Sequence, residues 1–561
     1  MTSRQPNTKR PKVGGAAAPP TLLRRQPARL RLVPPGSPRR QAVKALGTAP
    51  LGEPVLIGLS PADARHHVHM PGPTGTGKST LLINLAVADA RAGRGVAVFD
   101  PKGDLIRDLL DRLPASVGNR LVLIDPDEKQ APAALDLFDL GTDPESVADQ
   151  LVGVMAKVWA QYWGPRTDDL ARHAVLTLAH QPGATLADLP VLLADPAYRR
   201  RLLGYIRRKL GPVESAGLVA FWAWYDTLTP AAASVQVGPL LSKLRAVLSR
   251  RFAAELFGTG VSTFRLADIL DGGVLLVRLP PTLGDDTVRL TGSLLLAALL
   301  HAASGRADQR EADRLDASLI LDECQAFLHL PVGVDDALAQ ARALRLSLIL
   351  AHQHLGQLTP KMAAAIDANA RNKVFFSLSP RDARELAHHV APYFEAEDLT
   401  RRDAYGVVCR LVIDGRDGEP FSLNTRPAPP AWPGRAAELR AAARNRGLPA
   451  AERHAMAQAR QVGPNAPHQS AGQPVRPPQP TNNPTSGPTN ETEATSEHTD
   501  NPTVNPTGPT QHPTDPTGHP TGPTGSPTDR TGGEDIPADS PATPVPVPPA
   551  PTHRKPSRKG Q

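Results

Sequence analysis

Cysteine is nearly absent from this chain: its 561 residues include two, Cys324 and Cys409, far apart and within apolar segments. This scarcity excludes a disulfide framework and a cysteine-rich metal site, and it fits a reducing cytosol. Long hydrophobic runs are missing too. The longest candidate, 294–303, is too short to cross a bilayer, so we expect a core helix there and no intrinsic transmembrane segment. The N-terminus also lacks the pattern of a secretory signal.

Acidic residues are missing from positions 1–45, which contain eleven lysines and arginines and repeated prolines. The formal net charge of +8 belongs mostly to this segment, because removing its +11 leaves about −3 for the remainder. Such a composition cannot bury a core, so we expect a disordered basic arm. The arm suits nucleic-acid phosphates or an anionic membrane surface; a solubilising tail is the alternative interpretation.

The C-terminal segment 463–561 repeats Asn-Pro-Thr, Gly-Pro-Thr and His-Pro-Thr units, a composition that stays extended and solvated. The folded part is therefore expected between 46 and 462. Strand-like and helix-like runs alternate over 46–144 and again over 257–427, whereas 145–256 carries helical patterns alone. We predict an α/β fold with a mostly parallel sheet of about seven or eight strands and an all-α insertion. Residues 428–462 are expected to form a helical or extended connector.

A complete GxxxxGK[ST] phosphate-binding loop stands at Gly72-Pro73-Thr74-Gly75-Thr76-Gly77-Lys78-Ser79, followed by Thr80. Its context, a short strand before it and an amphipathic helix after it, distinguishes it from a chance glycine-rich turn. The glycines allow successive N–H groups to point at the β-phosphate at the helix N-terminus. Lys78 would bridge the β- and γ-phosphates, and Ser79 would ligate Mg²⁺. The loop predicts a site for ATP or GTP.

A second nucleotide motif follows the apolar run 317–321, where Asp322 and Glu323 stand at a predicted strand end. Asp322 would hold Mg²⁺, and Glu323 would orient and polarise the attacking water. An acidic pair alone is weak evidence, but together with the phosphate loop it indicates hydrolysis. The adjacent glutamate favours an ATP-hydrolysing motor over a GTP switch.

Three further polar positions are candidates near the nucleotide. Gln353 ends the next strand, where its amide would sense the γ-phosphate; capping the following turn is the alternative. Its neighbours His352 and His354 do not make a metal site without further ligands. Arg342, or Arg345 beside it, could stabilise charge in a neighbouring subunit's site as an arginine finger, or could lie on a solvated helix face.

A third group of polar residues, Asp100, Lys102 and Asp104, follows the strand 95–99. These side chains would lie near the nucleotide, because the carboxyl ends of parallel strands share one edge of a sheet. Two roles are open for them. They link nucleotide state to subunit contacts, or they cap the helix that follows.

The order of the segments GPTGTGKST, VFDPKGDL, a helical region, LILDE, ARALRLSLILAHQ and NARNKVFF resembles the TraG/TraD-type coupling ATPases of conjugation and type IV secretion. These belong to the HerA and FtsK superfamily of ring motors, and the resemblance covers 53–427. It implies a RecA-like P-loop fold, ATP and Mg²⁺ as ligands, a homo-hexamer, and DNA moved through a central channel largely without regard to sequence. By match to the family's motifs, Gln353 is the sensor and Arg342 the finger.

The region 145–256 resembles the all-α domain that this family associates with substrate choice. Its aromatic residues would then be either recognition surface or, more commonly at helical spacing, core: Trp159, Tyr162, Trp163, Trp222 and Trp224. The chain departs from the family by beginning with the basic arm instead of transmembrane helices. We therefore expect a cytoplasmic location, with attachment through a separate membrane-bound partner at the inner face of the membrane as an open alternative.

Three functions are consistent with these sequence features. The first is a DNA-translocating ATPase for conjugative or type IV secretion transfer. The second is a HerA-like helicase or translocase in DNA processing, which the missing membrane helices favour. The third is an ATPase that secretes protein substrates and never binds DNA. The DPKGDL segment and the helical insertion favour the first.

Overall fold

The computed structural model describes residues 43–51, 53–140 and 143–462. The expected disordered tail at 463–561 and nearly all of the expected arm at 1–45 lie outside these ranges. Lys44, which we assigned to the arm, is instead the first residue of a strand and is buried, with its ammonium donating to Asp89 and Ser318. The folded part therefore begins before position 46.

One sheet of eleven strands organises the described residues, in the order β2-β1-β13-β10-β9-β3-β8-β7-β4-β6-β5. The strands from β9 to β5 in that order pair in parallel, and β10, β13, β1 and β2 add an antiparallel edge. The strand bounds are β1 Lys44–Leu51, β2 Glu53–Leu59, β3 Val68–Pro71, β4 Gly95–Asp100, β5 Leu121–Ile124, β6 Val274–Arg278, β7 Ala317–Leu321, β8 Leu346–His352, β9 Asn372–Phe375, β10 Gly406–Arg410 and β13 Phe421–Thr425. A separate two-stranded sheet pairs β11 Val412–Ile413 with β12 Arg416–Asp417.

The prediction of a mostly parallel α/β sheet is confirmed, but the expected number of seven or eight strands is wrong. The hairpin of β1 and β2 was not foreseen as a unit, because Pro50 and Pro54 give it the composition of a loop. Proline is tolerated there since β2 is the edge strand of the sheet. The hairpin joins the sheet through β1, which pairs with β13 from the far end of the folded chain.

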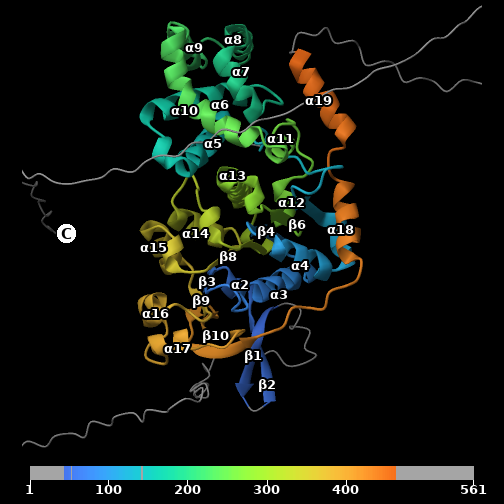
Figure 1. Cartoon of the computed structure of the whole chain (residues 1–561), viewed down its shortest axis with the longest axis vertical. Helices are drawn as coiled ribbons and strands as arrows, with labels where there is room; N and C mark the ends of the chain where they lie inside the picture. Colours follow the sequence, from blue (N-terminus) through green and yellow to red (C-terminus); the bar gives the residue numbers. More distant parts are fainter. Residues whose placement is uncertain (1–42, 52, 141–142, 463–561) are drawn as a thin grey trace, which may run out of the picture. The chain divides into compact units, whose positions relative to one another are not determined.

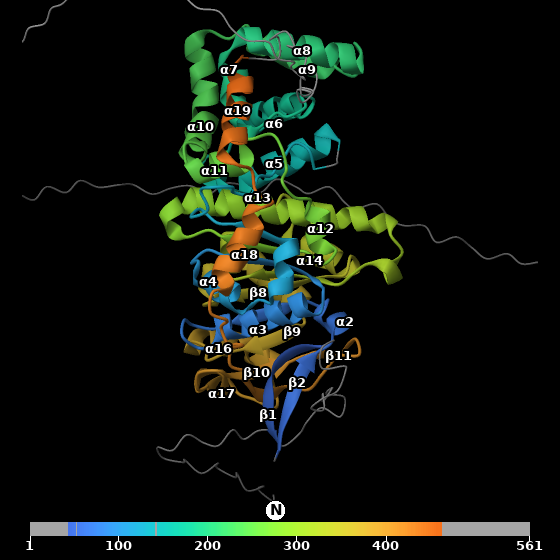
Figure 2. The same ribbon diagram turned by 90° about the vertical axis from the view of Figure 1, so that its right-hand side faces the viewer.

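Both faces of the sheet are buried, which explains why its central strands are continuous apolar runs. Val96 and Val98 of β4 pack into the cluster formed with α3 and α4, whereas Ala97 and Phe99 pack into the cluster formed with α13 and α14. Figures 1 and 2 show α3, α4 and α18 together on one side of the sheet. The helices named here are α3 Lys78–Arg91, α4 Asp104–Arg112, α13 Asp285–Ser304, α14 Val334–Ala343 and α18 Arg435–Arg444.

After the loop that follows β5, seven α-helices and no strand occupy the described residues 143–257. Three of them begin with an N-cap followed by proline: Asp143 and Asp195 before α5 and α8, and Thr229 before α10, each accepting a backbone N–H with its side chain. The helices are α5 Pro144–Val158, α6 Pro165–Ala179, α7 Leu189–Ala194, α8 Pro196–Leu210, α9 Ala216–Tyr225, α10 Pro230–Leu248 and α11 Arg251–Phe257.

The aromatic residues of this region divide between core and surface. Trp159 and Trp222 are buried, and the Trp222 indole N–H donates to the Thr177 hydroxyl at 2.8 Å. Tyr162 and Trp224 are exposed, whereas Trp163 is half-buried. The tryptophan pattern therefore reports mainly on packing within the helical region.

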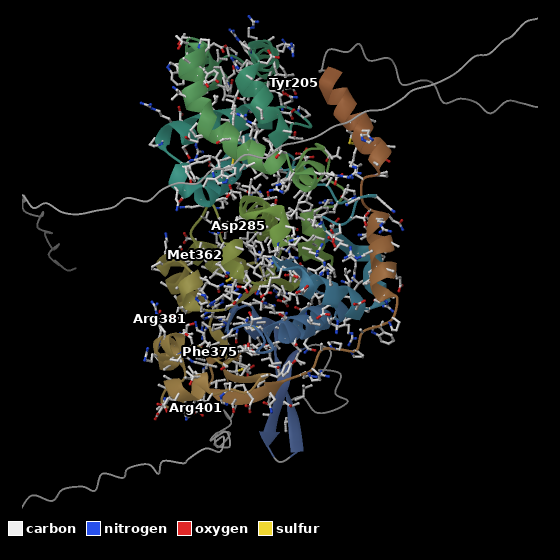
Figure 3. The ribbon with its side chains drawn as sticks, in the orientation of Figure 1. Tyr205, Asp285, Met362, Phe375, Arg381 and Arg401 are labelled. Atoms are coloured by element: carbon white, nitrogen blue, oxygen red, sulfur yellow. The ribbon has the colours of Figure 1, made fainter. Side chains whose placement is uncertain are left out.

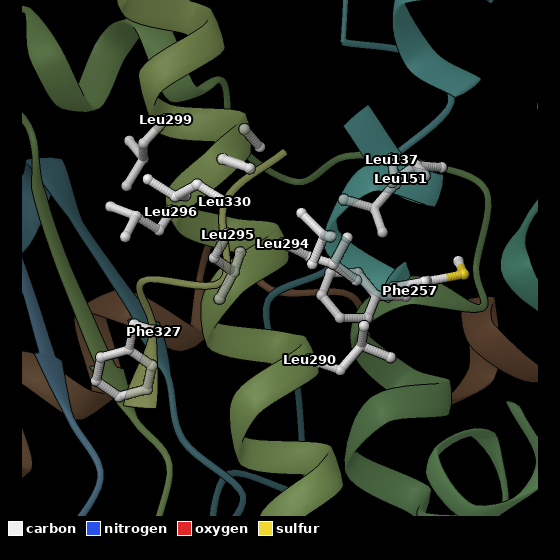
Figure 4. Packing of buried hydrophobic residues seen from close by; sticks show 14 of the residues in the cluster. Leu137, Leu151, Phe257, Leu290, Leu294, Leu295, Leu296, Leu299, Phe327 and Leu330 are labelled. Carbon is white, nitrogen blue, oxygen red and sulfur yellow. The ribbon is translucent and has the colours of Figure 1, made fainter. Parts of the chain in front are cut away.

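Helix α13 is the apolar helix expected around 294–303, and it is longer than that run. By length and composition, 285–308 could cross a membrane, but 67% of its most apolar window is buried inside the fold. Figure 4 shows its leucines, among them Leu290 and Leu294, packed against Phe257, Leu137 and Leu151. It connects the helical region to the sheet as a core helix.

The remaining helices border the sheet. The connector 428–462 is helical over α18 and α19, and α18 is held to the end of β5 by an ion pair between Arg440 and Asp125 at 2.8 Å. The other bounds are α2 Pro61–Ala64, α12 Leu266–Leu270, α15 Pro360–Asn369, α16 Pro380–Leu386, α17 Ala396–Thr400 and α19 Ala450–Val462.

Candidate functional site

The predicted phosphate loop connects β3 to α3, and α3 begins at Lys78. Gly75 and Gly77 have left-handed backbones, with φ of 83° and 107°, a conformation that glycine adopts without strain. Thr76 Oγ1 donates to the Pro73 carbonyl at 2.9 Å, which closes the loop on itself. Pro73, Thr74, Gly75 and Ser79 are exposed, so this side of the loop is open to a ligand.

Lys78 folds back over the loop. Its ammonium donates to the carbonyls of Gly72 and Pro73, the latter at 2.9 Å. Burial lowers the pKa of Lys78, and the charges of Asp322 and Glu323 oppose that shift. Both of these acceptors are neutral carbonyls, so a phosphate would attract the ammonium away from partners without charge.

Asp322 and Glu323 follow β7 directly and are both buried. Burial, followed by the charges of Glu323 and Asp100, raises the pKa of Asp322 to about 6. A divalent cation would relieve this crowding of negative charge, so the donor set of Asp322 with the Ser79 hydroxyl fits Mg²⁺, which prefers oxygen ligands. Glu323 has a left-handed backbone, with φ of 49°, an uncommon conformation for its residue type.

The Glu323 carboxylate is surrounded by donors from its own loop and from two other segments. Oε1 accepts from Lys102 Nζ at 2.5 Å and from Gln353 Nε2 at 2.6 Å. Oε2 accepts from Gln325 Nε2 at 3.1 Å and from Gln357 Nε2 at 3.3 Å. Burial alone would raise the pKa of Glu323, but these donors, Lys102 first among them, lower it. The carboxylate is therefore held ionised and oriented.

Gln353 connects the phosphate loop to Glu323. While its amide nitrogen donates to Glu323, its amide oxygen accepts from the Thr74 hydroxyl at 3.3 Å. The preceding His352 is buried against His69 of β3, with the two Nε2 atoms 2.8 Å apart. One side chain therefore bridges the phosphate loop and Glu323 by hydrogen bonds.

The three polar residues at the end of β4 and just after it make different contacts. Asp100 accepts from the backbone N–H groups of Lys102, Gly103 and Ile106 at 2.8, 2.7 and 3.1 Å, so it caps the start of α4. Lys102 instead reaches Glu323. Asp104 is exposed and lies 3.4 Å from Arg107 of the same helix.

The candidate arginines lie away from the phosphate loop of their own chain. Arg342 is exposed near the end of α14, and its charge helps lower the pKa of His66 and His67, which precede β3. The loop follows the other end of that strand. Arg345 donates to the Arg314 carbonyl at 2.7 Å and anchors the segment before β7.

A cleft of about 460 Å³ opens beside Glu323. Lys102 and Gln353 line it together with residues of α13 and α15, and Figure 3 labels one from each helix, Asp285 and Met362. Gln325 and Gln357 also line this cleft. Sequence reasoning missed these two glutamines, because no motif distinguishes them from ordinary loop residues.

No protein-family model and no curated protein sequence matches the chain. Among solved structures, the plasmid coupling protein TrwB in complex with ADP and Mg²⁺ matches with a TM-score of 0.51 at 16% identity, covering 72% of this chain and 95% of TrwB. TrwB with a non-hydrolysable ATP analogue gives 0.49 at 19% identity, covering 75% and 98%. VirB4 of Thermoanaerobacter pseudethanolicus gives 0.44 at 15% identity, covering 69% and 96%. The first of these confirms the predicted P-loop fold.

Proposed function

Since this chain has the fold of the coupling protein TrwB, we propose that it is an ATP-hydrolysing motor that moves DNA as a homo-hexamer in conjugative or type IV secretion transfer. The continuous contact path from Thr74 through Gln353 to Glu323 carries the hydrolysis part of this proposal. It joins the loop that would hold the γ-phosphate to the carboxylate that would face the water. We place the motor in the cytoplasm, with docking at a membrane-bound partner as part of the transfer function.

The residues divide the work of hydrolysis. Lys78 turns from the loop carbonyls to the β- and γ-phosphates, and the loop N–H groups bind the phosphate oxygens. Ser79 and Asp322 hold Mg²⁺, which supplies charge neutralisation to the phosphates when bound. Glu323, already ionised, accepts a hydrogen bond from the attacking water and aligns it. Gln353 couples the position of the γ-phosphate to that carboxylate.

Two substitutions test the hydrolytic site. Lys78→Ala should abolish binding of ATP with Mg²⁺, because the buried cation facing the phosphates is lost. Glu323→Gln should bind ATP as the wild type does but turn it over at least about 100-fold more slowly, the usual range for a lost general base. Calorimetric ATP binding and phosphate release measure the two effects separately. Wild-type turnover in Glu323→Gln would contradict the role given to this carboxylate.

Helix α8 presents the basic surface that supports DNA binding. Its residue Arg199 is buried and pairs with Asp226, but the other basic side chains of the helix are exposed. Tyr205, labelled in Figure 3, is exposed among them. A basic face that carries an aromatic ring suits a phosphate backbone with unstacked bases. The exposed basic residues are Arg200, Arg201, Arg207, Arg208 and Lys209.

DNA dependence of the ATPase separates this proposal from secretion of protein substrates. Single- or double-stranded DNA at low salt should raise phosphate release, and the effect should fall steeply between about 50 and 200 mM salt as phosphate contacts are screened. An anionic polymer without bases, such as heparin, is the control for charge alone. Turnover that no DNA changes at low salt would contradict the DNA function and leave the ATPase in place.

A further inference from the structure

The loop that precedes β10 is fixed to the phosphate loop at Tyr405. The Tyr405 backbone N–H donates to the Thr76 carbonyl at 2.8 Å, and its own carbonyl accepts from the Thr425 N–H of β13 at 2.8 Å. The residue has a left-handed backbone, with φ of 68°. For a bulky aromatic residue this conformation is a genuine outlier, and such outliers concentrate at ligand sites.

The Tyr405 ring lies against Gly77. A Cβ atom at Gly77 would come within 2.7 Å of the Tyr405 Cδ1 atom, so the glycine is needed for this approach as well as for its φ of 107°. Tyr405 as a whole is nevertheless 48% exposed. A large apolar ring held at the loop and half open to solvent offers a surface to whatever the loop binds.

The order of strands decides which part of a nucleotide lies there. On one side of β3 are β8 and β7, whose carboxyl ends carry Gln353 and Glu323, so the γ-phosphate faces that side. On the other side are β9 and β10, and Tyr405 immediately precedes β10. A nucleotide whose terminal phosphate faces Glu323 extends its base away from it, toward Tyr405.

We propose that Tyr405 is a stacking platform for the base of the bound nucleoside triphosphate, an inference that rests on the proposed ATPase function. An aromatic face stacks on the π face of a base without reading its edge. The platform therefore adds affinity for the nucleoside and favours the larger purines over pyrimidines. The hydrogen bond to Thr76 fixes the ring relative to the phosphates.

The test compares ligands with and without a base. Asparagine tolerates a left-handed backbone, so Tyr405→Asn removes the ring and keeps the loop. The variant should bind a non-hydrolysable ATP analogue with Mg²⁺ about tenfold more weakly and should bind inorganic tripolyphosphate as the wild type does. Tyr405→Phe should bind both like the wild type. Tyr162→Asn, at an exposed tyrosine of the helical region, is the matched control and should change neither.

Each outcome bears on one proposal. Unchanged affinity for the ATP analogue in Tyr405→Asn, or an equal loss for the analogue and tripolyphosphate, would overturn the platform. In both cases the nucleotide site would stand, because the wild type binds both ligands. A wild-type protein that binds neither ligand with Mg²⁺ would instead contradict the proposed ATPase itself.

Discussion

Among single residues, Lys102 makes the shortest contact with the Glu323 carboxylate, the group proposed to activate water. Its ammonium lies 2.5 Å from Glu323 Oε1, and it is the leading partner that lowers the pKa of Glu323. Lys102 itself is partly exposed in the cleft, with 44% of its side chain accessible. We therefore assign it a positioning role, in which it orients Glu323.

Replacing Lys102 should separate chemistry from binding. Lys102→Gln should lower kcat about tenfold or more while the Kd for ATP stays unchanged, because a carboxylate that is no longer oriented aligns water poorly. Steady-state turnover and calorimetric binding give the two values. Arg107→Gln, at an exposed position on the helix that follows Lys102, is the matched control and should change neither. A rise in turnover would mean that the ion pair restrains Glu323 instead of orienting it.

At the scale of elements, His67 joins three of them. Its Nδ1 accepts a hydrogen bond from the Leu348 N–H of β8 at 3.0 Å, and its Nε2 lies 2.7 Å from the Leu338 carbonyl of α14. His67 itself stands directly before β3 in the sequence. These partners require the neutral ring with the proton on Nε2. Burial is the main cause that lowers the pKa of His67 to about 4.

This pKa predicts an acid-sensitive fold. His67 takes up a proton near pH 6.5 in the unfolded chain and near pH 4 in the folded chain. The contribution of His67 to the free energy of unfolding is therefore complete above pH 6.5 and is lost as the pH falls to about 4. The loss amounts to about 3 kcal/mol. Urea unfolding at pH 7.5 and pH 4.5 should give a smaller difference for His67→Asn than for the wild type. The exposed His454→Asn should match the wild type, and equal differences in all three would contradict the prediction.

The elements predicted best from sequence are those whose local pattern and burial agree. Strands β3, β4, β7 and β8 are apolar runs followed by motif residues, and their carboxyl ends converge as predicted. The β1–β2 hairpin could not be foreseen, since its pairing with β13 is a contact between distant parts of the chain. Likewise, Gln357 and Tyr405 reach the site through tertiary placement alone, so no local pattern marks them.

For the whole molecule, the position of Arg342 has a consequence for assembly. Arg342 lies near His66 and His67, which lead into the amino end of β3. The phosphate loop follows the carboxyl end of the same strand. A finger at this position could therefore complete the site of a neighbouring subunit only. The head-to-tail contact of a closed ring provides such a neighbour.

Mixed rings test this arrangement. Combining Arg342→Ala subunits with Lys78→Ala subunits should restore ATP turnover that neither variant has alone, because the intact nucleotide site of an Arg342→Ala subunit receives the arginine of a Lys78→Ala neighbour. Phosphate release measured across a mixing series gives the curve. Arg310→Ala, at another exposed arginine, is the matched control and should leave turnover unchanged. Mixtures as inactive as the two separate variants would contradict action between subunits.

The placement of β3 between β8 and β9 also governs how the chain is made. His69 and His352, which face each other across β3 and β8, are 283 positions apart, so the strand that leads into the phosphate loop leaves the ribosome long before either of its neighbours. Until β8 has been synthesised, that strand has neither of its two partners in the sheet. Late, long-range pairing of this kind folds slowly and exposes unpaired strands to aggregation. Nascent chains released before β8 should therefore depend on chaperones and fail to bind nucleotide.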